Sequence, residues 1–262
     1  MRLRGSFILS CLIVVLLSLQ AGAQSELPKN IRWSQDNSDM VLVPAGEFTM
    51  GSEKLANEKP RHKVFLKDFY MDKFEVTNQQ YYKFCKDTGR ELPISMTNDK
   101  IPAGRENHPV CNVSFADAEA YCKWAGKRLP SEQEWEKAAR GTDGRVYPWG
   151  SGWDQSLSNN RTRRGEDTLP VGSIPRGASP YGLMDMAGNV WEWTDSWYKS
   201  YPNSPVNFDE TGKNRVARGG AYFYSIELLR TSYRHPLPPD DVSEYGGMRC
   251  ALDPDKVKPT NK

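Results

Sequence analysis

Helix signals are confined to residues 77–141 of this chain of 262 residues, and this restricts the folds that it can adopt. Three segments open with a hydroxyl residue that is followed, three positions later, by an amide or an acid, which is the capping-box pattern of a helix start. No comparable signal follows Gly141. The capping pairs are Thr77 with Gln80, Ser114 with Asp117 and Ser131 with Glu134, and the predicted helices run over 77–84, 114–124 and 131–139.

The remainder of the chain is typical of short strands and long loops. It is rich in residues that interrupt regular structure, with 21 Gly and 18 Pro, and it also holds 8 Trp and 12 Tyr. Large aromatic side chains can anchor loops to a core. Apolar runs predict short strands at 40–43, 47–50, 64–66 and 69–71. We therefore expect one α+β domain that is rich in loops and has about three helices.

The first 23 residues are typical of an export signal. Arg2 and Arg4 form a basic start, residues 7–19 are mostly apolar, and small residues at 21–23 provide a cleavage site. Cys11 could instead belong to a weak lipoprotein signal, but most of the apolar run would then follow the cut. We expect a periplasmic or extracellular protein after cleavage near Ala23. The expected parts are a signal at 1–23, a flexible segment at 24–38, a domain at 39–253 and a tail at 254–262.

Charge and hydropathy exclude two classes of partner. The formal net charge is +2 at pH 7, which gives no electrostatic reason to bind nucleic acid. No segment of the mature chain reaches the ~20 apolar residues that span a bilayer. We expect a monomer without a transmembrane segment, whose partner is a peptide or a small molecule.

Four cysteines remain after the signal, namely Cys85, Cys111, Cys122 and Cys250. An even number of cysteines in an oxidising compartment predicts disulfides, and three pairings are possible. None of the spacings is of the C-x-x-C kind, so a zinc site is not expected. Cys122 shares the apolar face of the second predicted helix and should point into the core.

Residues 181–194 gather ligands for a hard cation. Asp185 and Glu192 carry carboxylates, and the backbone carbonyls between them supply further oxygen atoms. Oxygen ligands of this kind are those that Ca²⁺ prefers. The alternative is that both residues are surface acids beside a turn.

A series of motifs runs in order through the mature chain. They are MVLVPAG (40–46), FTMG (48–51), EVTN (75–78), HPV (108–110), VSF (113–115), AGKRLPSE (125–132), EWE (134–136), YPWG (147–150), GNVWEWT (188–194), RGG (218–220) and GMR (247–249). Together they resemble the formylglycine-generating enzyme family, also called the sulfatase-modifying factor family. The resemblance covers about residues 38–253.

The resemblance implies a variant of the C-type lectin fold with two calcium sites. The second site has no clear acidic ligand here, because only Glu166 or Asp167 follows, beside two arginines. It would begin with Asn160 and the carbonyl of Arg161, or with Asn159 and Asn160 if the loop is aligned differently. The first site would use the side chains of Asp185 and Glu192 and the carbonyls of Gly188 and Val190.

The resemblance also implies a disulfide between Cys122 and Cys250. Because this bond closes a long loop, it should stabilise the fold by roughly 4–5 kcal/mol. Cys85 and Cys111 are then left to pair with each other.

One departure from the family concerns copper. Sulfatase-activating members bind Cu(I) through two cysteines shortly after the RGG motif, and they use oxygen to convert a substrate cysteine to formylglycine. A thiolate pair suits Cu(I). The corresponding positions here are Tyr224 and, approximately, Leu229, and no cysteine occurs between residues 123 and 249. We therefore expect no copper and no sulfatase activation.

The three histidines do not form an evident metal triad, because they are far apart in the sequence. His62 is expected at the surface, and His108 is expected to make structural hydrogen bonds. His235 lies close to the expected pocket and is the one that merits a test.

The segment after the RGG motif offers candidates for a ligand site. Aromatic rings can stack on a planar or peptide ligand, and arginines can pair with its acid groups. The alternative is that the aromatic residues and Arg249 only fill the core. The candidate ligand-binding residues are Trp191, Arg218, Tyr224 and Arg234, and the candidate catalytic residues are Tyr222, Tyr224 and His235, with a tyrosine as proton donor.

The hypothesis drawn from these features is an exported, calcium-stabilised domain of this family. It would be a cysteine-independent maturation or tailoring oxidoreductase, as some exported relatives in siderophore maturation are. The alternative is a non-catalytic module that binds a ligand or a protein on a lectin-like scaffold.

Overall fold

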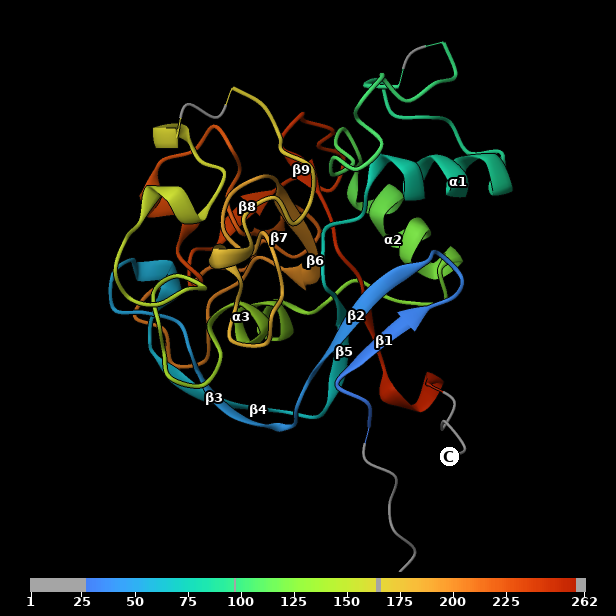
Figure 1. The fold of residues 1–262 in the computed structure, drawn as a ribbon. Coiled ribbons are helices and arrows are strands. Elements are labelled where there is room, and N and C mark those ends of the chain that lie inside the picture. The colour runs from blue at the N-terminus through green and yellow to red at the C-terminus, as the bar shows by residue number, and fades with distance from the viewer. Residues whose placement is uncertain (1–26, 97, 164–165, 258–262) are drawn as a thin grey trace, which may run out of the picture.

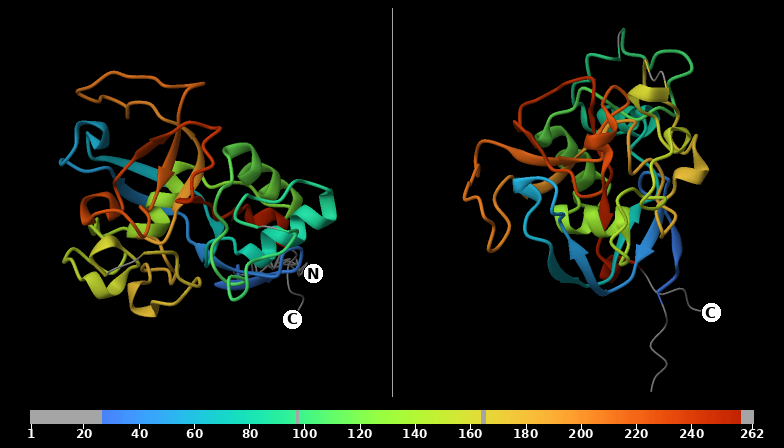
Figure 2. Two further views of the ribbon diagram at one scale, coloured as in Figure 1. Left: turned by 90° about the horizontal axis from the view of Figure 1, so that it is seen from above. Right: turned by 90° about the vertical axis from the view of Figure 1, so that its left-hand side faces the viewer.

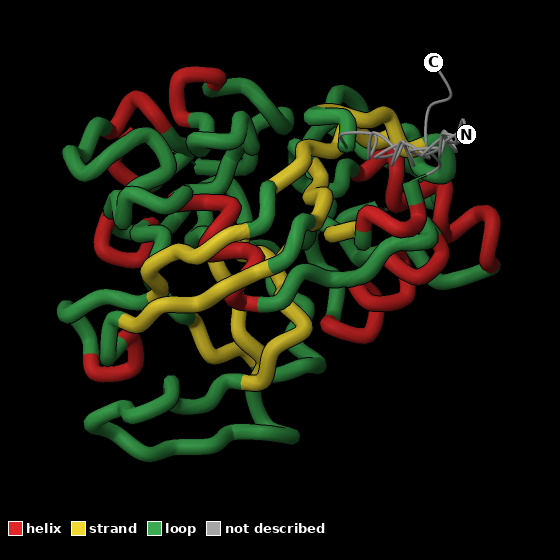
Figure 3. Tube along the Cα trace, turned by 90° about the horizontal axis from the view of Figure 1, so that it is seen from below, coloured by secondary structure: helices red, strands yellow, loops and turns green. Residues whose placement is uncertain are grey.

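Loops make up most of the chain in the computed structural model, which describes residues 27–96, 98–163 and 166–257 (Figures 1 and 3). The expected export signal lies outside the described residues. None of the described helices is long and apolar enough to cross a membrane. The α-helices are α1 (Asn78–Thr88), α2 (Phe115–Trp124) and α3 (Glu132–Arg140), and 3₁₀ turns lie at Ala56–Glu58, Gln155–Leu157, Arg161–Arg163, Pro175–Gly177, Ile226–Leu229 and Pro254–Lys256.

All three helix starts carry the predicted capping box. At α3, the amide of Glu134 donates to Ser131 Oγ at 3.2 Å, and the amide of Ser131 donates to Glu134 Oε2 at 2.8 Å. These bonds satisfy backbone donors that a helix start otherwise leaves unpaired. Beyond α3, the described residues form no α-helix. The prediction of a loop-rich α+β fold with three helices is confirmed.

One antiparallel sheet brings the two ends of the domain together. Its strand order is β1-β2-β5-β10. Residue Met71 pairs with Val41 on one side and with Ala251 on the other. The strands are β1 (Asn30–Trp33), β2 (Ser38–Val43), β5 (Phe69–Asp72) and β10 (Ala251–Leu252).

The structure corrects the expectation that residues 24–38 form a flexible segment. Residues 30–33 are β1, which pairs with the start of β2. Two long-range hydrogen bonds hold this hairpin on the domain. Trp33 Nε1 donates to the carbonyl of Ala125 at 2.7 Å, and Tyr70 donates its hydroxyl to the carbonyl of Pro28, also at 2.7 Å.

The second half of the chain forms a four-stranded sheet in the order β8-β7-β6-β9. Helix α3 contacts β6 and β7 of this sheet and also β3 of a separate hairpin (Figure 1). The segment between β6 and β7 reaches away from the rest of the molecule (Figure 2). The strands are β3 (Gly46–Met50) and β4 (His62–Leu66) in the hairpin, and β6 (Trp191–Trp197), β7 (Arg215–Arg218), β8 (His235–Leu237) and β9 (Gly246–Gly247) in the sheet.

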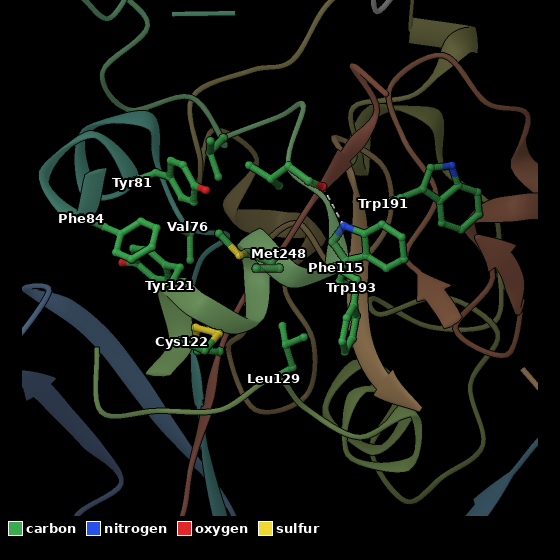
Figure 4. Packing of buried hydrophobic residues seen from close by; sticks show 14 of the residues in the cluster. Val76, Tyr81, Phe84, Phe115, Tyr121, Cys122, Leu129, Trp191, Trp193 and Met248 are labelled. Atoms are coloured by element: carbon green, nitrogen blue, oxygen red, sulfur yellow. Dashed lines mark hydrogen bonds between the residues drawn. A yellow bond between two sulfur atoms is a disulfide. The ribbon is translucent and has the colours of Figure 1, made fainter. Parts of the chain in front are cut away.

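The largest apolar cluster joins α1 and α2 to β6 (Figure 4). Tyr81 of α1 lies against Tyr121 of α2 with 5.8 Å between the ring centroids. On the β6 side, Trp193 donates its Nε1–H to the carbonyl of Val113 at 2.9 Å. The cluster therefore fixes β6 against the helices, and β6 in turn positions the residues described below.

A disulfide joins Cys122 of α2 to Cys250, which precedes β10, with 5.9 Å between the Cα atoms. This pairing agrees with the one that the resemblance implied. It ties α2 to the terminal sheet and closes a segment of 128 residues.

The second expected disulfide is not formed, and this is a correction. Cys85 and Cys111 are both free thiols. Pro109 is bridged to Thr77 at the start of α1. Cys85 lies eight residues further along, about 12 Å at the rise of an α-helix. Disulfides usually join Cα atoms 4.4–6.8 Å apart, so the helix carries Cys85 away from Cys111.

Candidate functional site

An aromatic patch lies where β6, β8 and the loops that flank β8 meet. Pairing of β6 with β7 and of β7 with β8 places Trp191 and His235 close together. The two rings stack with 4.5 Å between their centroids, and Tyr224 makes a T-shaped contact with Trp191 with 5.4 Å between the ring centroids. Aromatic contacts of this kind contribute about 0.5–1.5 kcal/mol each. The aromatic patch consists of Trp191, Phe223, Tyr224, Tyr233, His235 and Tyr245.

The outer edge of the aromatic patch is open to solvent. Phe223 is 50% exposed, and its ring stacks on Tyr245 at 6.0 Å between centroids. The guanidinium of Arg161 lies 5.5 Å from the centre of the Phe223 ring. An exposed ring beside a guanidinium can receive a planar group and an acid of one ligand.

Trp191 forms the inner wall of the patch and carries an unpaired donor. The side chain is 2% exposed, and its buried Nε1–H has no hydrogen-bond partner among the described residues. A buried donor without an acceptor costs about 1–3 kcal/mol. An acceptor atom supplied by a ligand would relieve this cost.

Tyr222 borders a separate cavity of about 360 Å³, whose lining includes His108 and Cys111. Burial raises the pKa of Cys111 to about 12, so the thiol stays protonated and is a poor nucleophile. Burial also raises the pKa of Tyr222 and lowers the pKa of His108. His108 Nδ1 lies 2.8 Å from Thr168 Oγ1, which fits the structural role expected for this histidine.

Tyr224 and Leu229 follow the RGG turn, where the family resemblance led us to expect the copper-binding positions, the second only approximately. Tyr224 packs in the aromatic patch. Leu229 is fully buried, and a Cβ placed on Gly220 would lie only 2.3 Å from Leu229 Cδ2. Leu229 therefore fills the space under the RGG turn.

Arg218 and Arg234 do not line an accessible site, which corrects their assignment as ligand-binding residues. Arg234 donates Nε and Nη2 to the carboxylate of Glu132 at 2.6 and 2.9 Å. Arg218 pairs with Glu136 and donates Nη1 to the carbonyl of Tyr233 at 2.5 Å. Both arginines are almost completely buried. They neutralise the carboxylates of α3 and are not free to pair with a ligand.

The first expected calcium site fits the structure only in part. Glu192 is fully buried and accepts Arg249 Nε and Nη2 at 2.6 and 2.7 Å, together with Trp135 Nε1 at 2.7 Å. Its carboxylate is therefore the counterion of Arg249. Asp185 has no ion-pair partner within 4.0 Å among the described residues, and its Oδ2 accepts the amide of Gly172 at 2.6 Å. Asp185 is thus suited to a cation, while Glu192 is already neutralised.

The second expected calcium site is organised by internal hydrogen bonds. Asn160 is fully buried, and its Oδ1 accepts the amides of Thr162 and Arg163 at 2.9 and 3.3 Å. Its Nδ2 donates to the carbonyl of Ser158 at 2.9 Å. Arg161 turns its side chain toward Phe223. The side-chain oxygen that the resemblance assigns to calcium is thus occupied by backbone donors of its own turn.

Glu75 belongs to the same region and was missed from the sequence. It lies in the EVTN motif just before α1 and is 1% exposed. Its Oε2 accepts Asn189 Nδ2 at 2.7 Å, whereas Oε1 is buried without a partner. The motif could have drawn attention to Glu75, but the capping box of α1 explained the motif equally well.

The sequence matches the family described as sulfatase-modifying factor enzyme 1-like domain over residues 24–254. The chain belongs to this family. It is 33% identical to the formylglycine-generating enzyme of Mus musculus, over 82% of this chain and 75% of that relative. It is 32% identical to the hercynine oxygenase of Mycolicibacterium smegmatis, over 81% of this chain and 61% of that relative.

The fold is similar to that of a solved structure. The solved structure of PvdO from Pseudomonas aeruginosa superposes with a TM-score of 0.73 at 26% identity, covering 86% of this chain and 97% of that one. The family thus includes a formylglycine-generating enzyme and a hercynine oxygenase.

A first prediction compares Arg234, which pairs with a buried carboxylate, with Arg161, which lies at the surface. Arg234→Ala should lower the free energy of unfolding by about 3–5 kcal/mol, because buried Glu132 loses the guanidinium that donates two hydrogen bonds to it. Arg161→Ala, at the exposed edge of the aromatic patch, should change it by no more than about 0.5 kcal/mol. Denaturant unfolding followed by tryptophan fluorescence measures both. Equal effects of the two changes would contradict these roles.

A second prediction concerns pH and His235. Burial against the patch lowers the pKa of His235. The unfolded chain therefore binds this proton more tightly than the folded chain. The contribution of His235 to stability is complete above its unfolded pKa of about 6.5, and it is lost as the pH falls toward the lower pKa of the folded state. His235→Gln should lose less stability than the unchanged protein between about pH 7 and 5. Urea unfolding across this range measures the difference, and parallel pH profiles would count against it.

Proposed function

We propose that this protein is an exported oxidoreductase of the sulfatase-modifying factor family that matures or tailors its substrate without copper. The observation that carries the proposal is that residues 123–249 contain no cysteine, so that Tyr224 and buried Leu229 follow the RGG motif where the resemblance would place a thiolate pair. Neither side chain is a ligand for Cu(I). The surrounding scaffold is kept, which supports a different chemistry at the same place.

The aromatic patch is the proposed substrate site. A planar group would stack on Phe223, and an acid group would pair with Arg161. In the reaction class proposed, the substrate loses two electrons and two protons to O₂, which gives the oxidised product and hydrogen peroxide. Tyr224, whose ring contacts Trp191, would be the group that exchanges a proton with the bound ligand.

The second candidate function is a non-catalytic binding module. The exposed ring of Phe223 and its guanidinium neighbour favour it, because they lie at the surface on loops. Loops on a rigid scaffold commonly carry recognition residues. The same patch would then bind a peptide or a small molecule without changing it.

Calcium and export complete the proposal. Asp185, with backbone carbonyls of residues 188–190, would hold a calcium ion that stabilises the loop before β6. The ion would supply charge neutralisation and would take no part in the reaction. Export rests on the basic and apolar pattern of residues 1–23.

The test begins with native mass spectrometry of the protein purified from cells that export it, to identify the bound ligand. That ligand is then incubated with the protein in air and under nitrogen. We expect loss of two hydrogen atoms from the ligand and formation of peroxide in air alone. Phe223→Ala should weaken ligand binding, whereas Phe65→Ala, which removes a more exposed ring on β4, should not. A ligand that is bound but unchanged in air would refute the oxidoreductase and support the binding module.

A further inference from the structure

The cavity of about 360 Å³ beside the aromatic patch has no part in the proposed reaction. Its lining comes from the start of α1, from the loop that follows α1 and from the segment that contains Tyr222. The ring of Tyr222 contacts Tyr245 of the aromatic patch, with 5.6 Å between the ring centroids. Phe223 and Arg161 do not belong to the described lining of the cavity, which is therefore a space of its own.

Arg105 forms a fixed wall of this cavity. Its Nη1 lies 2.9 Å from His108 Nδ1 and donates to Thr168 Oγ1 at 3.2 Å. Its Nη2 forms an ion pair with Asp167. The carbonyl of Arg105 accepts Asn78 Nδ2 at 2.9 Å. The wall is thus built before any ligand arrives, and the charge of Asp167 is already neutralised.

Two buried side chains of the lining carry polar atoms that lack partners. Tyr222 is 7% exposed and Asn78 is 8% exposed, and both line the cavity. Asn78 uses its Nδ2 for the carbonyl of Arg105, whereas its Oδ1 accepts no hydrogen bond from a described residue. The hydroxyl of Tyr222 likewise has no partner within the described ranges. Buried polar atoms are normally paired, so these two atoms are suited to a ligand.

The loop that carries Glu244 is tied to the same cavity from both sides. Asn112 lines the cavity and donates its amide to the carbonyl of Ser243 at 3.2 Å, directly before Glu244. Tyr245, directly after Glu244, is the residue whose ring contacts Tyr222. The carboxylate of Glu244 is therefore held on a short segment at the edge of the cavity.

The charge of the lining is negative. Glu166 and Glu244 line the cavity, and neither has an ion-pair partner within 4.0 Å in the described part of the chain. Arg105 is the one cation of the described lining, and it is paired with Asp167. Burial, and then the charge of Glu244, raises the pKa of Tyr222, which agrees with a negative potential in the cavity. A lining of this charge favours a cationic ligand.

We propose that the cavity binds the ammonium group of a primary amine. The three N–H groups of the ammonium would donate to Asn78 Oδ1, to Tyr222 Oη and to the carboxylate of Glu244. Within the described ranges, no group of three or more His, Cys, Asp or Glu side chains could hold a metal ion, which favours an organic cation. This inference goes beyond the proposed oxidation and does not depend on it.

The experiment titrates the full chain by calorimetry with putrescine, and with 1-butanol as an uncharged probe of similar length. We expect saturable binding of one equivalent of putrescine and no binding of 1-butanol. Excess calcium chloride should leave the affinity for putrescine unchanged. Nα-acetyl-lysine amide is titrated in parallel. Tighter binding of this derivative would identify a lysine side chain as the ligand, and tighter binding of putrescine would identify a free amine.

Two variants test the proposed contacts. Tyr222→Phe removes only the hydroxyl and should weaken putrescine binding by about tenfold, because a hydrogen bond to a charged group is lost. Its matched control is Tyr181→Phe, a partly buried tyrosine of another apolar cluster, which should bind normally. Glu244→Gln should weaken binding by about threefold, as expected for an exposed charge pair. Its matched control is Glu47→Gln, an exposed acid on β3.

Three results would overturn the proposal. They are no saturable uptake of either amine, displacement of putrescine by calcium, and equal affinity of the unchanged protein and both cavity variants. Thermal unfolding shows whether Tyr222→Phe is folded. Should it fold poorly, Glu244→Gln decides alone, because its position is exposed, and unchanged affinity there overturns the site.

Discussion

The fold depends most on the carboxylates that α3 presents to the second half of the chain. Glu132 and Glu136 lie one turn apart, and both are buried. They receive Arg218, the last residue of β7, and Arg234, which directly precedes β8. Breaking a buried ion pair by removing one partner leaves an uncompensated charge, at a cost of about 3–5 kcal/mol. The second half of the described chain has few regular elements, and these buried ion pairs therefore hold it against α3.

This arrangement decides which groups remain for recognition. Arg218, Arg234 and Arg249 are committed to carboxylates inside the protein. The groups that remain for recognition are the rings of the aromatic patch, and Arg161 is the guanidinium beside the exposed ring of Phe223. The interior of the scaffold is thus held by charged pairs, while the candidate site is aromatic and lies on loops. A site on loops can change its ligand among relatives while the scaffold stays the same.

The sequence predicted what local chemistry determines. The three capping boxes depend on residues three positions apart, so the helix starts could be read directly. The partners of the buried arginines could not be predicted in this way, because Arg218 and Glu136 are 82 residues apart in the sequence and Arg234 and Glu132 are 102 residues apart. An arginine beside aromatic residues suits a ligand site or an ion pair equally well. Strand β1 was missed because it is only four residues long and none of them is buried, so that its pairing with β2 is what defines it.

The loss of the thiolate pair is the central claim, and cuprous ion tests it most directly. Under nitrogen, the folded protein with its Cys122–Cys250 bond intact is titrated with Cu(I) against a competing chelator, using the Cys85→Ser/Cys111→Ser double variant to remove the free thiols. The account predicts no stoichiometric uptake, since a phenol and an alkyl group stand where the ligands would be. Tight uptake of one equivalent by that variant, lost on Tyr224→Phe, would contradict it.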